Sequence, residues 1–196
     1  MWILIIGLLL FLLPHLLREL GQRDRLMASL PSIGAYKGIY TLVVLTGLVL
    51  IIFGKSQSPF VMIWQPIYEL RFLSMVLMIP AVILVLAGNL PPNYLRKYLR
   101  NPMLLGVTLW GIAHLWANGD LASILLFGSF TLWAGGKFMA KSFNGTSSTA
   151  ASLNTTGSAQ TASIIWDGIA IAAGLAIYVL ISIYHGQLFG VGLSFE

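Results

Sequence analysis

Long apolar runs alternate with short polar connections along the whole chain. Each run approaches or reaches the 20 or so residues that a helix needs to cross the hydrocarbon core of a bilayer. The pattern predicts six transmembrane helices, in spans near residues 1–18, 38–54, 72–90, 101–118, 121–137 and 167–188. We therefore expect an all-α fold, a polytopic membrane helix bundle that forms a single membrane domain over residues 1–196.

One connection differs from the others in composition. Residues 142–163 are rich in Ser, Thr, Ala, Gly and Asn and carry no charged side chain. Such a composition is typical of a flexible linker. We expect it to join the fifth and sixth spans. The sequence shows no internal repeat of the kind found in inverted-repeat transporters, which disfavours transport.

Composition supports the membrane assignment and excludes several kinds of chemistry. Hydrophobic residues make up 58% of the chain and charged residues 9%, whereas a soluble domain is about 25% charged. The mean hydropathy is +0.88. Because the chain contains no cysteine, it has no disulfides, thiolate ligands or cysteine nucleophile.

The basic residues predict how the chain is oriented in the membrane. Only Lys55 and Arg71 lie on one side of the expected spans. On the other side lie Arg18, Arg23, Arg25, Lys37, Arg96, Lys97, Arg100, Lys137 and Lys141. Positive residues favour the cytoplasmic side, so we expect both termini outside, in a multi-pass protein of the inner membrane. The net charge of +5 then reflects topology and lipid contact, and we expect no nucleic-acid partner.

Three histidines are the most informative polar residues because intramembrane polar groups need a partner or a function. His114 lies on the fourth span with the small residues Gly106 and Gly111 on its helix face. That face suits either a packed helix or a flat ligand. His15 follows Pro14 and is either a ligand or an interfacial side chain. His185, beside a tyrosine, is typical of an interfacial residue.

The depths of two histidines in the bilayer allow them to share a ligand but do not require it. At 1.5 Å per residue, His15 and His114 differ in depth by about 8–10 Å, an estimate whose error is nearly as large. Two imidazoles on opposite sides of one iron need nitrogens about 4 Å apart. Helix tilt and side-chain reach can close that gap.

The motif Asn118-Gly119-Asp120 interrupts the apolar pattern after the fourth span. Gly119 is suited to end a helix and Asp120 to cap the next one, accepting from backbone donors near Ser123. This interpretation predicts a tight antiparallel hairpin. The alternative is that Asp120 relays protons. The sequence otherwise lacks a metal cluster, a phosphate loop and a nucleophile elbow, and we assign no catalytic residue.

Several motifs together resemble the NnrU family of integral membrane proteins. The resemblance runs through residues 99–103, Trp110, 113–115, 117–120 and 127–128, and extends to Gly7, Phe11, His15, Arg18 and 184–186. It covers nearly the whole chain, most weakly over residues 142–163. One position departs from the family, which usually has Arg-His-Pro where this chain has Arg100-Asn101-Pro102.

The resemblance implies a function linked to nitrogen-oxide metabolism and denitrification. The family is similar to zeta-carotene isomerase, a haem b protein, which implies that His15 and His114 ligate haem iron between the first and fourth helices. Arg18 and Arg100 are the expected partners of the haem propionates. One alternative is a haem-dependent carotenoid cis–trans isomerase acting on an apolar polyene, although Asn101 weakens it. The other is a non-catalytic assembly or regulatory factor that works with membrane respiratory proteins, so we leave open whether the protein is an enzyme.

Overall fold

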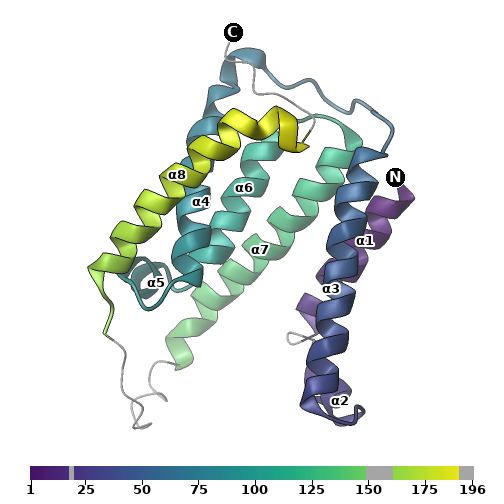
Figure 1. Ribbon diagram of the computed structural model, residues 1–196, viewed down its shortest axis with the longest axis vertical. Coiled ribbons are helices and arrows are strands. Elements are labelled where there is room, and N and C mark those ends of the chain that lie inside the picture. Colours follow the sequence, from purple (N-terminus) through teal and green to yellow (C-terminus); the bar gives the residue numbers. More distant parts are fainter. Residues whose placement is uncertain (18–19, 149–160, 190–196) are drawn as a thin grey trace. The chain divides into compact units, whose positions relative to one another are not determined.

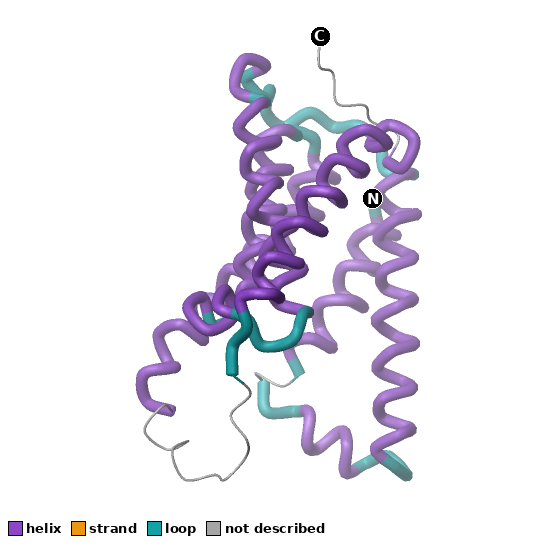
Figure 2. The backbone as a smooth tube through the Cα atoms, turned by 60° about the vertical axis from the view of Figure 1, so that its left-hand side comes forward, coloured by secondary structure: helices purple, strands orange, loops and turns teal. Residues whose placement is uncertain are grey.

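The computed structural model describes residues 1–17, 20–148 and 161–189 (Figure 1). These residues form helices joined by loops and contain no strand beyond one isolated bridge, which confirms the all-α fold (Figure 2). Four described helices are long and apolar enough to cross a membrane: α3 (Ile33–Ser56), α4 (Phe72–Asn89), α7 (Leu121–Ser148) and α8 (Ile164–Phe189). Two shorter apolar helices, α1 (Trp2–Leu16) and α6 (Pro102–Ala117), occupy the remaining expected spans.

Several helix boundaries differ from the expected spans. α3 begins at Ile33, well before residue 38, because the Ser32 hydroxyl caps it by accepting from Ala35 N at 3.0 Å. α7 continues to Ser148, so the beginning of the expected linker over residues 142–163 is helical. Residues 149–160 of that expected linker lie outside the described residues.

Short helices that the apolar pattern did not predict lie in the connections. They are α2 (Arg23–Ala28), the 3-10 turn η1 (Tyr68–Leu70) and α5 (Tyr94–Leu99). Each is too short to give a periodic pattern that stands out from a polar loop. Among them, α5 joins α4 to α6.

The chain divides into two compact units. The first comprises Met1–Gln65 with Asn118–Ser129, and the second comprises Pro66–Ala117 with the chain from Phe130 onward. α7 begins in the first unit and continues in the second. His15 belongs to the first unit and His114 to the second.

Close contact between backbones holds α1 and α3 together in the first unit. A β-carbon on Gly7 would lie 2.6 Å from the backbone nitrogen of Ile51. Similarly, a β-carbon on Gly47 would lie 2.7 Å from the backbone nitrogen of Phe11. Small residues let membrane helices approach this closely, so that van der Waals packing stabilises the antiparallel pair.

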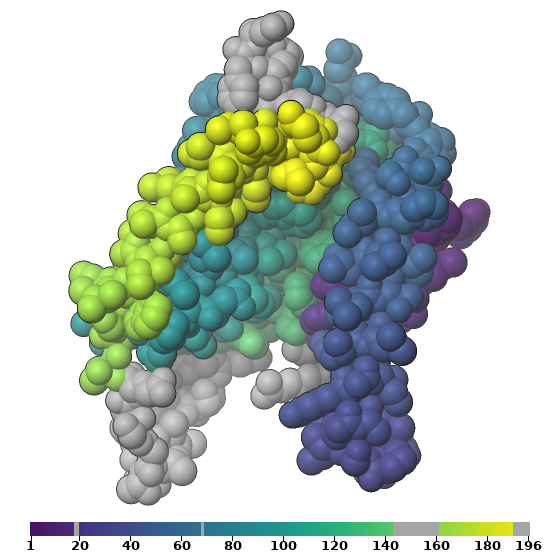
Figure 3. All heavy atoms as spheres, in the orientation of Figure 1, coloured from purple at the N-terminus to yellow at the C-terminus, as the bar shows by residue number. Residues whose placement is uncertain are grey.

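The second unit uses the same kind of packing around α4. A β-carbon on Gly106 of α6 would lie 2.7 Å from the carbonyl oxygen of Ala81, and one on Gly174 of α8 would lie 2.7 Å from the Ile83 side chain. Figure 3 shows α8 along the face of the teal helices of this unit. The sequence left open whether Gly106 faces a helix or a ligand, and the structure shows that it faces α4.

A buried carboxylate fixes the start of α8 against α5. The two carboxylate oxygens of Asp167 accept from the backbone nitrogens of Tyr94 and Leu95, each at 2.9 Å. Asn93 caps the same helix, since its Oδ1 accepts from Arg96 N at 2.8 Å. Sequence reasoning missed Asp167, because nothing local links it to a helix about 70 positions earlier.

Candidate functional site

His15 lies in the last turn of α1, directly after Pro14. Its Nδ1 is 2.6 Å from the carbonyl oxygen of Phe11, and its ring stacks on the Phe11 ring with centroids 4.7 Å apart. The ring of Tyr40 in α3 is a further aromatic neighbour, with its centroid 5.8 Å from that of His15. Because a carbonyl oxygen only accepts, Nδ1 carries the hydrogen and the lone pair of the neutral imidazole is on Nε2.

His114 has the same arrangement on α6. Its Nδ1 is 2.8 Å from the carbonyl oxygen of Trp110, one turn earlier, so its Nε2 also carries the lone pair. The two rings lie 5.2 Å apart, and Trp110 meets Phe130 edge to face at 5.6 Å. His114 is therefore held in one orientation beside an aromatic cluster of α6 and α7.

His185 of α8 belongs to the surroundings of His114. The two imidazoles are close enough to interact electrostatically, and His185 also packs against Phe189 at 5.0 Å. Sequence reasoning treated His185 only as an interfacial residue. Among the described residues, no group of three or more His, Asp or Glu side chains is placed to hold a metal ion.

Of the two arginines expected to pair with the haem propionates, the structure describes only Arg100. Arg18 lies outside the described residues. Arg100 follows α5 with φ of 58°, and its Nη1 donates to the Ser142 carbonyl at 3.1 Å. It lies about 20 Å from His114 along the chain of α6, at 1.5 Å per residue. The pairing of His15 with His114 at one iron stays a prediction.

The turn between α6 and α7 confirms the predicted helix cap. Asp120 Oδ1 accepts from the backbone nitrogen of Ser123 at 3.0 Å. The turn also pairs with the loop after α3, since Gly119 O accepts from Ile63 N at 2.8 Å and Leu121 N donates to Val61 O at 2.8 Å. These backbone hydrogen bonds hold the start of α7 against the loop that follows α3 in the first unit.

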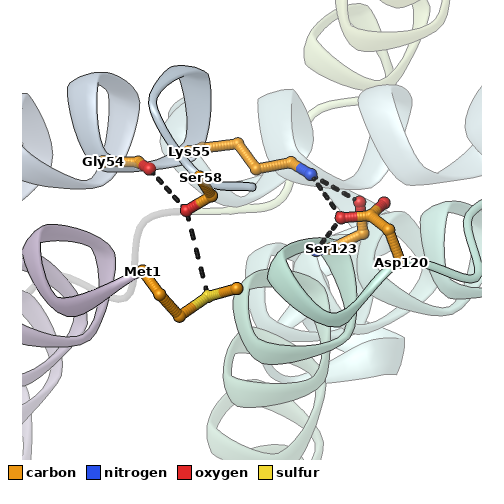
Figure 4. A network of polar contacts seen from close by, with 6 residues as sticks. All are labelled: Met1, Gly54, Lys55, Ser58, Asp120 and Ser123. Atoms are coloured by element: carbon orange, nitrogen blue, oxygen red, sulfur yellow. Dashed lines mark hydrogen bonds and ion pairs between the residues drawn. The ribbon is translucent and has the colours of Figure 1, made fainter. Parts of the chain in front are cut away.

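Lys55, which the sequence offered only as a topology signal, completes this network. Its Nζ donates to Asp120 Oδ1 at 2.9 Å and to Ser123 Oγ at 2.8 Å (Figure 4). Partial burial raises the pKa of the Asp120 carboxyl, but the hydrogen bonds from Ser123 and Lys55 outweigh it and hold that pKa below its ordinary value. A carboxyl kept ionised in this way is a poor proton carrier at neutral pH, which argues against the relay alternative. The sequence contained one hint of this contact, because the expected topology places Lys55 and Asp120 on the same side of the membrane.

We expect Asp120→Asn to lower the free energy of unfolding by about 0.5–1 kcal/mol at neutral pH, because Lys55 loses its anionic partner while Asn still caps α7. A carboxyl with a depressed folded pKa stabilises the fold above its unfolded pKa, which is about 3.9. That contribution disappears as the pH falls through the folded value. The unfolding free energy in mixed micelles, measured from neutral pH to pH 3, should therefore converge for the two proteins at low pH. A constant difference across this range would contradict the ion-pair account.

Comparison with known proteins identifies the family to which the chain belongs. A family model described as NnrU protein matches residues 3–193, nearly the whole chain and all of the described helices but the first residue of α1. Comparisons with curated proteins and with solved structures gave no match. The matched range includes both histidines with the shared orientation, and it confirms the resemblance expected from the sequence motifs. The chain belongs to the NnrU family.

Proposed function

We propose that this NnrU-family membrane protein binds haem b and ligates its iron through His15 and His114. The supporting observation is the shared orientation of the two imidazoles, each with Nδ1 on a backbone carbonyl one turn earlier. Metal-ligating histidines usually donate their other ring N–H to such a carbonyl, which fixes the tautomer and raises the basicity of the ligating nitrogen. Both residues thus present Nε2 as the ligating atom.

The surroundings of the two histidines also fit a flat apolar group. Phe11 and Tyr40 flank His15, and Trp110 flanks His114, so the neighbours are aromatic rings. When bound, haem supplies a redox-active iron. The chain's own residues hold the two imidazoles in their orientation.

The propionate partner in this proposal is Arg18, which follows His15 by three positions in the sequence. Arg100 is left out of the haem site. Its guanidinium bonds to the Ser142 carbonyl, and it precedes α6 at the end remote from His114. A guanidinium near His15 would pair with a propionate carboxylate by charge-assisted hydrogen bonds.

We infer a role in nitrogen-oxide metabolism in the inner membrane, with the N-terminus outside, from the family and from the distribution of basic residues. The carotenoid isomerase alternative gains no support from Asn101. Its Oδ1 accepts from Lys141 Nζ at 3.4 Å, and an amide supplies neither an iron ligand nor a titrating group there. The haem-binding role therefore stands ahead of isomerase chemistry.

The experiment that tests haem binding is an optical spectrum of the protein purified from cells supplied with haem. We expect a Soret band and one haem per chain by pyridine haemochrome assay. A colourless protein, folded by circular dichroism and purified under the same conditions, would contradict the proposal. The metabolic part is tested separately by deleting the gene, and unchanged growth on nitrite would contradict it.

A further inference from the structure

Four exposed basic side chains lie where α5 connects α4 to α6 in the second unit. We call them the basic patch, which consists of Arg96, Lys97, Arg100 and Lys141. The haem proposal uses none of them. We propose that the basic patch binds the phosphate headgroup of an anionic phospholipid in the adjoining leaflet.

Two crossed contacts bring cations from different helices into this patch. Arg100, at the end of α5, donates from Nη1 to the Ser142 carbonyl at 3.1 Å. Lys141, the residue before Ser142, donates from Nζ to Asn101 Oδ1 at 3.4 Å. The cations of α5 and α7 are thus held beside each other by neutral partners, which leaves their charges uncompensated.

Acidic side chains in this unit do not neutralise the basic patch. Within the described part of the second unit, the acidic residues are Glu69 and Asp167. Glu69 precedes α4 at the end opposite α5, and the oxygens of Asp167 accept from the first backbone N–H groups of α5. Asp120 belongs to the first unit and pairs there with Lys55. A phosphodiester supplies the missing negative charge.

The position of α5 favours a lipid over a free phosphate ion. It joins the ends of two apolar helices, which places it at the level of the membrane–water interface. The rings of Tyr94 and Tyr98 stack at 6.2 Å, and Tyr98 is 74% exposed. Lys97 Nζ lies over both rings, at 5.7 and 5.9 Å. Tyr94, Tyr98, Met103 and Met139 are exposed. These side chains can contact the acyl chains of a lipid, which a free phosphate ion does not have.

The test measures lipid binding to the delipidated full-length protein by native mass spectrometry in a neutral detergent. Phosphatidylglycerol is compared with phosphatidylcholine of identical acyl chains. We expect phosphatidylglycerol to bind more tightly, and Arg100→Gln with Lys141→Gln to weaken it about 25-fold, at about fivefold for each cation. The charge-conserving pair Arg100→Lys with Lys141→Arg should retain most of the preference.

The matched control removes two exposed basic residues from the first unit, Arg25→Gln with Lys37→Gln. This pair has the same effect on net charge, and we expect it to change phosphatidylglycerol binding less than twofold, because neither residue belongs to the basic patch. Equal weakening by both pairs would overturn the proposal. So would equal affinity for the two lipids, or displacement of phosphatidylglycerol by inorganic phosphate at matched concentration.

Discussion

Changing His114 to Ala should abolish the Soret absorbance of the purified protein. Loss of an outer partner of a ligand typically weakens metal affinity by 10–100-fold, so losing the ligand itself should weaken haem affinity by about 100-fold or more. Since the backbone hydrogen bonds of α6 do not depend on the contact of His114 Nδ1 with the Trp110 carbonyl, removing the imidazole should leave α6 folded. Absorbance per chain, with circular dichroism to check the helices, measures both effects.

Two further variants separate ligation from packing. His114→Met keeps a side chain of similar length that can ligate iron, so haem should be retained with a shifted spectrum. His185→Ala is the matched control, because His185 interacts with His114 from the same unit yet has no ligand role in the proposal. Loss of the Soret band in His185→Ala, with retention in His15→Ala, would contradict the assigned pair.

Local sequence patterns predicted the features that depend on neighbours along the chain. The apolar runs located the four long and two shorter apolar helices, and the spacing from Asp120 to Ser123 predicted the cap of α7. Cap chemistry acts over three residues, so a single sequence contains it. The short helix α5 lacked a comparable signal because its six residues span less than two turns.

Contacts between distant residues could not be predicted in the same way. Lys55 and Asp120 are 65 positions apart, and only the expected topology placed them on one side of the membrane. The sequence showed that Gly106 lies on the same face as His114, but it did not show that α4 covers that glycine. The proposed haem site poses the same problem, because His15 and His114 are far apart in the sequence and belong to different units.

The largest effect on stability is expected from Gly7→Ala in the contact between α1 and α3. The new β-carbon would lie 2.6 Å from Ile51 N, 2.9 Å from the Leu50 carbonyl carbon and 3.0 Å from Gly47 O. All three neighbours are backbone atoms, so no rotamer change relieves the clash and the helices must separate. Overpacking of this kind costs about 1–3 kcal/mol, and we expect the upper end of that range.

Gly38→Ala in α3 is the matched control for this substitution. A β-carbon there meets nothing within 4 Å, so only the helix preference of Ala over Gly remains, worth about 0.5–1 kcal/mol in favour of the variant. The two variants should therefore change the unfolding free energy in mixed micelles in opposite directions, although they make the same chemical change. Because Tyr40 of α3 contacts His15 of α1, Gly7→Ala should also weaken haem binding. Equal stability of the two variants would show that α1 and α3 do not pack through Gly7.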